Sequence, residues 1–141
     1  MKKSIFIIED DISLAGAMQS QFNLGGFSAE INRGGEDDME DLINEIKKVD
    51  ADIVILDLIL PKFDGFEIIK KIRSDEEISD IYIFIFTDVS DEDSKARGLR
   101  VGANQYFIKE DFSVEEFSNK VKRIMENREA MEGGDKNTYQ I

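Results

Sequence analysis

The chain has 141 residues, which favours a single domain, and 41% of them are apolar, which excludes intrinsic disorder for most of its length. Its net charge of −13 repels nucleic-acid phosphates and anionic lipid, so we expect no direct binding to nucleic acid or membrane. Cys and His are both absent, which excludes disulfides, thiolate zinc sites, Ser-His-Asp triads and the phospho-histidine chemistry of kinases. No apolar run approaches a membrane span or a signal-peptide core, so we expect a cytoplasmic protein.

Five short apolar runs, rich in β-branched and aromatic residues, predict five strands. In chain order they are Ile5–Ile8, Phe27–Ile31, Ile53–Leu56, Ile81–Phe86 and Tyr106–Ile108. Four of these runs are nearly continuous, which is typical of strands that are buried on both faces. The second run alternates apolar and polar residues, so we expect a half-exposed edge strand.

Amphipathic segments between and after these runs predict five helices. Their apolar stripes are, in chain order, Leu14 to Phe22, Met39 to Val49, Phe66 to Ile72, Ser90 to Val101 and Val114 to Ile124. The fourth segment has few apolar residues and contains Gly98, so we expect its helix to be short and mobile. Asp11 and Asp64 are predicted N-caps, and Ser113 to Glu116 has the pattern of a capping box.

The repeated strand–helix order predicts an α/β fold, a doubly wound five-stranded parallel sheet with five helices on both faces. We expect the domain to occupy residues 1–131. The polar, Gly-containing residues 132–141 are predicted to be a flexible C-terminal tail or the start of a linker.

Polar residues follow the predicted strands at the ends where open α/β sheets bind their ligands. They are Glu9, Asp10 and Asp11 after the first strand, Asp57 after the third, Thr87 and Asp88 after the fourth, and Lys109 after the fifth. Carboxylates gathered this closely cannot all stay ionised without a counter-ion. Mg²⁺ is the common choice among hard dications with oxygen ligands. The competing interpretation, solvated loop and cap residues, is the one we adopt for Asp11.

The same residues contain the parts needed for phosphoryl transfer. Asp57 would be the nucleophile that forms an acyl phosphate, and Thr87 would supply a hydroxyl donor. Lys109 and Mg²⁺ together would neutralise charge on the transferred group. Nothing in the sequence is similar to an ATP-binding loop, so the phosphoryl donor must come from a partner.

Over about residues 4–128, the chain resembles the receiver domain of two-component response regulators. The resembling segments are Ile-Ile-Glu-Asp-Asp at 7–11, Ile-Leu-Asp-Leu at 55–58, Leu-Pro-Lys-Phe-Asp-Gly-Phe-Glu at 60–67, Phe-Thr at 86–87, Gly-Ala-Asn-Gln-Tyr at 102–106 and Lys109. The resemblance implies a flavodoxin-like sheet in the order 2-1-3-4-5, as in a chemotaxis regulator of this family. It also implies that Asp10, Asp57 and the backbone carbonyl of Ile59 bind Mg²⁺, with Glu9 completing the acidic pair.

The resemblance further implies a phosphorylation switch. Asp57 would accept the phosphoryl group from a sensor histidine kinase or a histidine phosphotransfer protein, and Lys109 would bind it. Thr87 and Tyr106 would form a switch pair that acts on a downstream output domain or protein. From the residues alone, Tyr106 could equally be a core aromatic. Such a chain catalyses its own phosphorylation and slow dephosphorylation and is not a stand-alone metabolic enzyme.

The sequence departs from the family's pattern in three places. Asp88 stands where a small residue is usual, and we expect it to repel phosphodonors and to pair with Lys109. Glu110 follows Lys109 in place of the usual cis-proline, so we expect a rebuilt loop. Asn104 and Gln105 replace two acids before the switch aromatic, which removes one half of the ion pairs used in the family's dimers.

Two apolar residues are predicted to modulate the lifetime of the phosphorylated state. Ile59 and Val89 lie two residues after Asp57 and Thr87, where the family places side chains that flank the phosphoryl group. Branched apolar side chains cannot position a water molecule and restrict its approach, so we expect a long-lived phospho-aspartate. The alternative, that both residues merely pack against neighbouring loops, stays open.

Two other functions remain as alternatives. A degenerate receiver could act as a constitutive protein-binding module without phosphorylation, an interpretation supported by Asp88 and by the missing proline. A phosphatase or another stand-alone enzyme would need an acid–base group near Asp57, and the absence of His makes this the weakest alternative.

Overall fold

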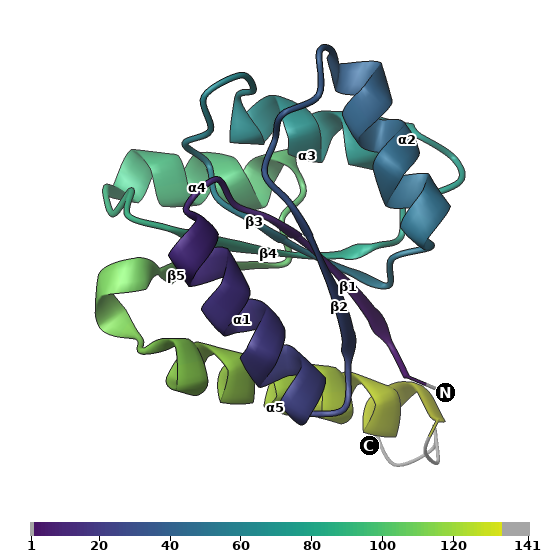
Figure 1. The fold of residues 1–141 in the computed structure, drawn as a ribbon, viewed down its shortest axis with the longest axis vertical. Coiled ribbons are helices and arrows are strands. Elements are labelled where there is room, and N and C mark those ends of the chain that lie inside the picture. The colour runs from purple at the N-terminus through teal and green to yellow at the C-terminus, as the bar shows by residue number, and fades with distance from the viewer. Residues whose placement is uncertain (1, 134–141) are drawn as a thin grey trace, which may run out of the picture.

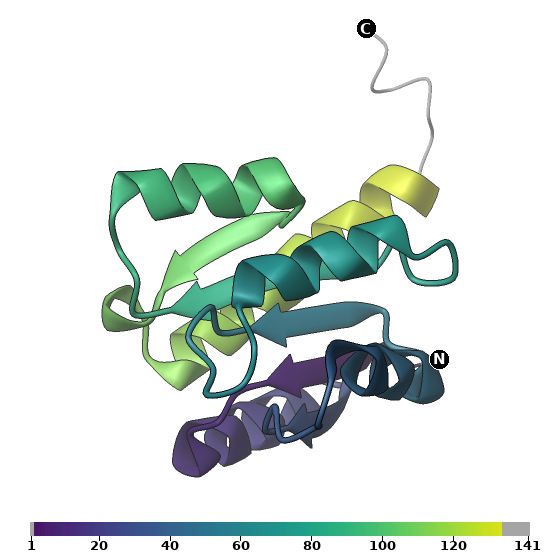
Figure 2. The same ribbon diagram turned by 90° about the horizontal axis from the view of Figure 1, so that it is seen from above.

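A five-stranded sheet lies at the centre of the molecule, with all strands parallel and in the order β2-β1-β3-β4-β5 (Figure 1). The strands are β1 (Ser4–Ile8), β2 (Ser28–Asn32), β3 (Ile53–Leu56), β4 (Tyr82–Thr87) and β5 (Gln105–Ile108). The structure is a computed structural model and describes residues 2–133. The order and the parallel direction, visible in Figure 2, confirm the predicted doubly wound fold.

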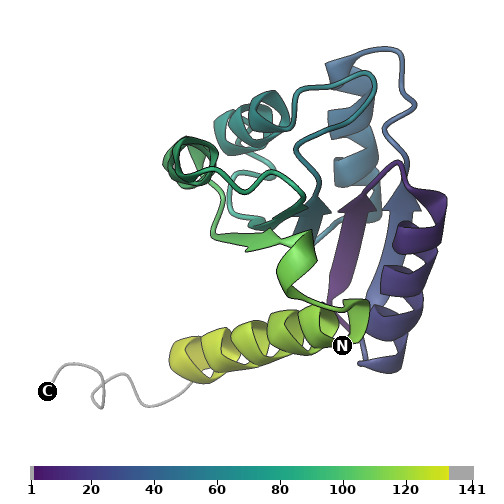
Figure 3. The same ribbon diagram turned by 90° about the vertical axis from the view of Figure 1, so that its left-hand side faces the viewer.

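Helices cover both faces of the sheet (Figure 3). They are α1 (Ile12–Leu24), α2 (Met39–Val49), α3 (Gly65–Ser74), α4 (Glu92–Val101) and α5 (Val114–Gly133), with one 3₁₀ turn, η1 (Lys109–Asp111). The α1 and α5 helices pack on one face, and α2, α3 and α4 pack on the other. No helix within residues 2–133 is long and apolar enough to cross a membrane.

The continuous apolar runs are explained by two cores, one on each side of the sheet. Successive side chains of a strand point to opposite faces. Ile5 and Ile7 of β1 therefore pack in the core under α1 and α5, whereas Phe6 and Ile8 pack in the core under α2 and α3. The alternating run Phe27–Ile31 becomes the edge strand β2, as predicted.

The predicted caps are present at the helix starts. The carboxylates of Asp11 and Asp64 accept hydrogen bonds from backbone N–H groups of α1 and α3. The Ser113 hydroxyl accepts from the Glu116 N–H at 3.1 Å, and the Glu116 carboxylate accepts from the Ser113 N–H at 2.8 Å. These bonds satisfy backbone donors that a helix cannot satisfy itself and so fix where the three helices begin.

The structure differs from the expectations at the carboxyl-terminal part of the sheet. β5 was expected to be buried on both faces, but all four of its residues are half-buried. Its place at the second edge of the sheet is the one that the order 2-1-3-4-5 implied. Asp91 caps α4, which is ten residues long. The α5 helix continues to Gly133, past the expected domain end at residue 131. The remainder of the predicted tail, residues 134–141, lies outside the described residues.

Arg73, near the end of α3, forms hydrogen bonds with both segments that lead into β4 and β5. Its guanidinium donates to the backbone oxygens of Ser79, Ile81 and Gly102 and to the side-chain oxygen of Asn104, at 2.6–2.9 Å. Gly102 has φ +126°, and a Cβ there would lie 2.7 Å from Cγ of Arg73. Glycine is therefore required both by the backbone conformation and by the close approach of Arg73.

Candidate functional site

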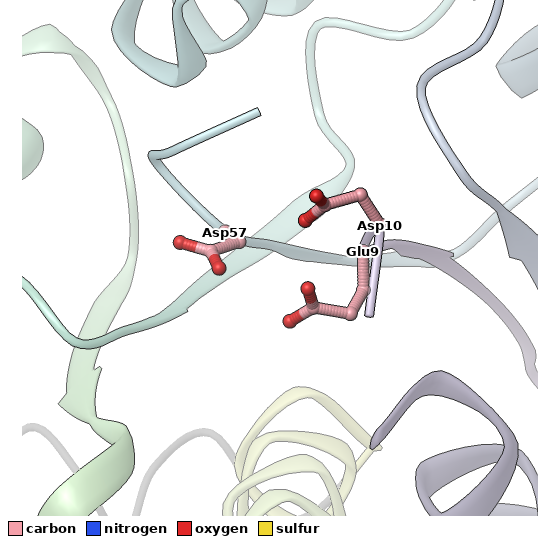
Figure 4. A group of neighbouring side chains, drawn as sticks. All are labelled: Glu9, Asp10 and Asp57. Carbon is pink, nitrogen blue, oxygen red and sulfur yellow. The ribbon is translucent and has the colours of Figure 1, made fainter. Parts of the chain in front are cut away.

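Three carboxylates gather at the carboxyl ends of two neighbouring strands. Glu9 and Asp10 follow β1, Asp57 follows β3, and these two strands pair directly. Oxygens of the three side chains lie within 4.8 Å of one another and face the same space (Figure 4). Glu9 and Asp57 are buried. The parallel sheet thus brings together acids from segments that are far apart in the sequence.

Lys109 is the cation of this cluster. Its ammonium lies 2.7 Å from Oε1 of Glu9 and 2.7 Å from Oδ2 of Asp57, and its side chain is only 14% exposed. Burial alone would lower the pKa of Lys109, but its hydrogen bonds to Asp57 and Glu9 outweigh burial, so the pKa is raised. Burial raises the pKa of Glu9, and Lys109 only partly offsets this effect.

Three donors orient the Asp57 carboxylate. Oδ2 accepts from Lys109, whereas Oδ1 accepts from the hydroxyl of Thr87 at 2.7 Å and from the backbone N–H of Ile59 at 3.1 Å. Thr87 is fully buried at the end of β4. Because both oxygens are engaged, the orientation of this carboxylate is defined by its neighbours.

The Asp10 carboxylate differs from those of Glu9 and Asp57 in its hydrogen-bond and ion-pair partners. Within residues 2–133, its half-buried carboxylate accepts no hydrogen bond and forms no ion pair, whereas Glu9 bonds both Lys109 and the N–H of Asp11. Clustered carboxylate oxygens are the donor set of a hard dication. The residues therefore fit a metal ion, and the Asp10 carboxylate is the one most available to it.

Glycine at position 65 determines how closely α3 approaches the loop after Asp57. A Cβ on Gly65 would lie 2.6 Å from Cα of Leu58, and the Gly65 N–H donates to the Leu58 oxygen at 3.2 Å. Ile59 and Asp64 form a bridge across the same loop. The Asp-Gly pair predicts a turn, but this backbone contact, which shapes the loop that carries the Ile59 carbonyl, is visible only in three dimensions.

Tyr106 extends from β5 toward the loop that precedes α4. Its hydroxyl donates to the backbone oxygen of Val89 at 2.6 Å. Burial, with added effects from the charges of Asp91 and Asp57, raises the pKa of Tyr106 to about 12. The phenol is therefore a neutral hydrogen-bond donor at physiological pH.

The expected modulating residues lie beside the cluster. Ile59 is 66% exposed, and both Ile59 and Val89 line a groove of about 490 Å³ between the β3–α3 loop and α4. Asp88 is exposed. The expected pair between Asp88 and Lys109 is absent from the described residues, because the ammonium is held by Glu9 and Asp57 instead.

The loop after Lys109 contains a short helical turn. Residues 109–111 form the single 3₁₀ turn η1, and the N–H of Phe112 donates back to the Lys109 oxygen at 3.3 Å. The described residues contain no cis peptide bond. This turn leaves the Lys109 side chain directed into the acidic cluster.

Comparison with known proteins identifies the class. The family model of the response regulator receiver domain matches residues 5–122, so the chain belongs to the response regulator receiver domain family. Response regulator ArlR of Staphylococcus aureus (strain Mu50) is 31% identical over 86% of this chain and 52% of its own length. RpaA of Synechocystis, named a DNA-binding dual master transcriptional regulator, is 28% identical over 86% and 48%. The chain thus spans about half the length of the curated relatives it matches.

Solved structures agree with this assignment. A two-component response regulator from Clostridium difficile is 26% identical, with a TM-score of 0.75, over 89% of this chain and 97% of that one. The BeF3-activated receiver domain of DrrB is 25% identical, with a TM-score of 0.73, over 89% and 99%. The family-model match, over residues 5–122, includes the acidic cluster and Lys109.

Proposed function

We propose that the chain is a phosphorylation-dependent signalling receiver that accepts a phosphoryl group on Asp57. The donor is a sensor histidine kinase or a histidine phosphotransfer protein, the reaction depends on Mg²⁺, and a downstream output domain or protein reads the result. The observation that carries this proposal is the Asp57 carboxylate, held by Lys109, Thr87 and an N–H group beside two further acids. The complete cluster argues against the degenerate, constitutive binding module.

The chemistry follows from the groups around Asp57. A carboxylate oxygen of Asp57 attacks phosphorus, an acyl phosphate bond forms, and the bond to the donor breaks with its electron pair leaving on the donor. The Lys109 ammonium and the Thr87 hydroxyl, which contact Asp57 directly, can then donate to phosphoryl oxygens. Asp10, Asp57 and the Ile59 carbonyl, beside Glu9, would hold Mg²⁺, which supplies positive charge against those oxygens when bound.

The expected partners follow from charge and from family membership. The net charge of −13 supports a receiver segment that does not itself contact nucleic acid or membrane. DNA binding is stated for RpaA, of whose length this chain covers 48%. We therefore propose protein partners in the cytoplasm. A gel-shift titration of this chain with duplex DNA at low salt should show no complex, and a salt-sensitive complex would contradict the proposal.

Asp57→Asn tests the proposed function directly. Intact-mass measurement after incubation with acetyl phosphate and Mg²⁺ should show one added phosphoryl group on the parent and none on the variant. Asp93→Asn, which changes an exposed aspartate of α4, is the matched control and should be labelled like the parent. Labelling at another residue, or without Mg²⁺, would refute the mechanism. An unlabelled parent would favour the constitutive binding module.

Asp10→Asn should weaken Mg²⁺ binding more than Glu9→Gln. Asp10 is the acid whose carboxylate has no other partner among the described residues, whereas Glu9 is already engaged by Lys109. We expect a loss on the order of tenfold for Asp10→Asn and a smaller loss for Glu9→Gln, measured by isothermal titration calorimetry. Equal losses would mean that the two acids were assigned the wrong roles.

The double variant Ile59→Asn/Val89→Glu should shorten the half-life of phospho-Asp57 several-fold. Polar side chains at these two positions can hydrogen-bond a water molecule that branched apolar chains exclude. The measurement is loss of phosphoryl label in excess Mg²⁺ after the donor is removed. Leu24→Asn, which changes an exposed apolar residue at the far end of α1, is the control. A double variant as slow as the parent would show that these side chains do not gate hydrolysis.

Asp88→Ala should raise the rate of phosphorylation by acetyl phosphate. Asp88 is exposed and adds a negative charge next to Thr87, without the Lys109 pairing that would neutralise it. Repulsion of an anionic donor is strongest at low ionic strength, so the increase should shrink as salt is added. A rate that is unchanged at low salt would remove Asp88 from the modulating residues.

A further inference from the structure

The α4 helix approaches the sheet through a glycine. Gly98 is the buried residue of this helix, and it faces Ile85 of β4 and Tyr106 of β5. A Cβ on Gly98 would lie 2.7 Å from Cδ1 of Ile85 and 3.1 and 3.3 Å from Cδ2 and Cε2 of Tyr106. The Tyr106 ring therefore lies so close to the helix that a Cβ at position 98 would press on it.

Hydrogen bonds continue from this ring to the phosphoacceptor. The Tyr106 hydroxyl donates to the Val89 oxygen at 2.6 Å, and the Val89 N–H donates to the Thr87 hydroxyl oxygen over a longer 3.4 Å. The Thr87 hydroxyl in turn donates to Oδ1 of Asp57 at 2.7 Å. The position of the Tyr106 ring is thus linked to the Asp57 carboxylate through two intervening residues.

We propose that Gly98 is a positioning residue whose bare backbone seats the Tyr106 ring and thereby couples α4 to Asp57. The proposal rests on the proposed function, because it concerns how a phosphoryl group on Asp57 reaches α4. With the ring seated, its hydroxyl holds the Val89 oxygen, and the Val89 N–H faces Thr87. Coupling between two sites is reciprocal. Because the hydrogen bonds of the seated ring lead to the Thr87 hydroxyl beside Asp57, we expect displacement of the ring to weaken the binding of a phosphoryl group there.

Gly98→Ala is expected to displace the ring. The methyl group that this substitution adds would meet two neighbours, and the terminal Cδ1 of Ile85 can rotate away from it. The Tyr106 ring is rigid, so the whole ring must shift away from the helix. Gly16→Ala in α1 is the matched control, because it makes the same change inside a helix and nothing lies within 4 Å of the added Cβ. Both substitutions raise helix propensity equally.

Fluorine NMR of protein labelled with 3-fluorotyrosine reports the ring directly. The three tyrosines of the chain give three resonances, which single Tyr→Phe variants assign. Gly98→Ala should shift the Tyr106 resonance and leave that of Tyr82 in place, while Gly16→Ala should shift neither. An unmoved Tyr106 resonance in Gly98→Ala would overturn the proposal. An unmoved Tyr82 resonance shows that the variant is folded.

The same samples test the coupling to Asp57. In the presence of Mg²⁺, Gly98→Ala should bind the phosphoryl analogue beryllofluoride at least about fivefold more weakly than the parent, and Gly16→Ala should match the parent. A shifted ring with unchanged affinity would overturn the coupling. The double variant Ile85→Val/Gly98→Ala, which removes Cδ1 of Ile85, should keep the ring shift. Loss of that shift would assign the effect to Ile85 and overturn the proposal that Gly98 positions the ring.

Failure of the proposed function has a different signature. A parent that binds no beryllofluoride and takes up no phosphoryl group from acetyl phosphate would overturn the receiver function and, with it, the coupling to Asp57. The Tyr106 resonance would still test whether Gly98 positions the ring, because that measurement requires neither Mg²⁺ nor a phosphodonor.

Discussion

Lys109→Met is expected to reduce the rate of phosphorylation by acetyl phosphate about 10²–10³-fold, the range found when one transition-state donor is removed. The ammonium of Lys109 lies 2.7 Å from Oδ2 of Asp57. The same substitution should strengthen Mg²⁺ binding, because Lys109 is a cation already paired with two of the carboxylates that would hold the metal. The measurements are an intact-mass time course and isothermal titration calorimetry with Mg²⁺.

Stability gives a second readout for Lys109→Met. Removing the cation leaves buried Glu9 and Asp57 without their common partner, so the metal-free variant should unfold at a lower temperature than the parent. Mg²⁺ should therefore raise the unfolding temperature more in the variant than in the parent. Lys120→Met, an exposed change on α5, should alter neither quantity. Weaker Mg²⁺ binding in Lys109→Met would contradict the competition between the two cations.

Arg73→Met is expected to lower the free energy of unfolding by about 3 kcal/mol, because it leaves three backbone oxygens and one amide oxygen without their charged donor. For a domain of this size, the melting temperature should fall by about 10 °C. Urea unfolding followed by circular dichroism measures the loss. The ammonium of Arg73→Lys cannot reproduce the guanidinium geometry, so this variant should recover only part of the stability.

The control for Arg73 is Arg100→Met, which removes an exposed arginine from α4 and should change the free energy of unfolding by less than about 0.5 kcal/mol. The acidic cluster lies at the opposite ends of the strands, so Arg73→Met should bind Mg²⁺ like the parent while it remains folded. Equal stabilities of the two arginine variants would show that the Arg73 hydrogen bonds do not stabilise the fold.

The architecture was predictable because its signals are local. Continuous apolar runs arise where both faces of a strand are covered, as for Ile5–Ile8 between two cores. The caps at Asp11, Asp64 and Ser113 depend on residues within one helical turn. The gathering of Glu9, Asp10 and Asp57 also followed, since the carboxyl ends of adjacent parallel strands share one edge of the sheet.

The remaining features depend on contacts between distant segments. The run Tyr106–Ile108 is as apolar as a central strand, and its half-burial depends on how the neighbouring helices cover the edge of the sheet. The expected ion pair between Asp88 and Lys109 is not formed among the described residues, because Glu9 and Asp57 bind the Lys109 ammonium instead. Gly98, interpreted from sequence as a weak point of its helix, is the residue through which α4 contacts Tyr106. No local pattern distinguishes a destabilising glycine from one required by close packing.

The Arg73 contacts also restrain one end of α4. Its carboxyl end is attached through Gly102, whereas its amino end follows the loop that contains Val89. A helix of ten residues is about 15 Å long. Tilting it by about 10° around the Gly102 end would carry the other end through roughly 2.6 Å and leave Gly102 nearly stationary. We therefore expect backbone hydrogen exchange in α4 to be slowest near Gly102 and to quicken toward Asp91.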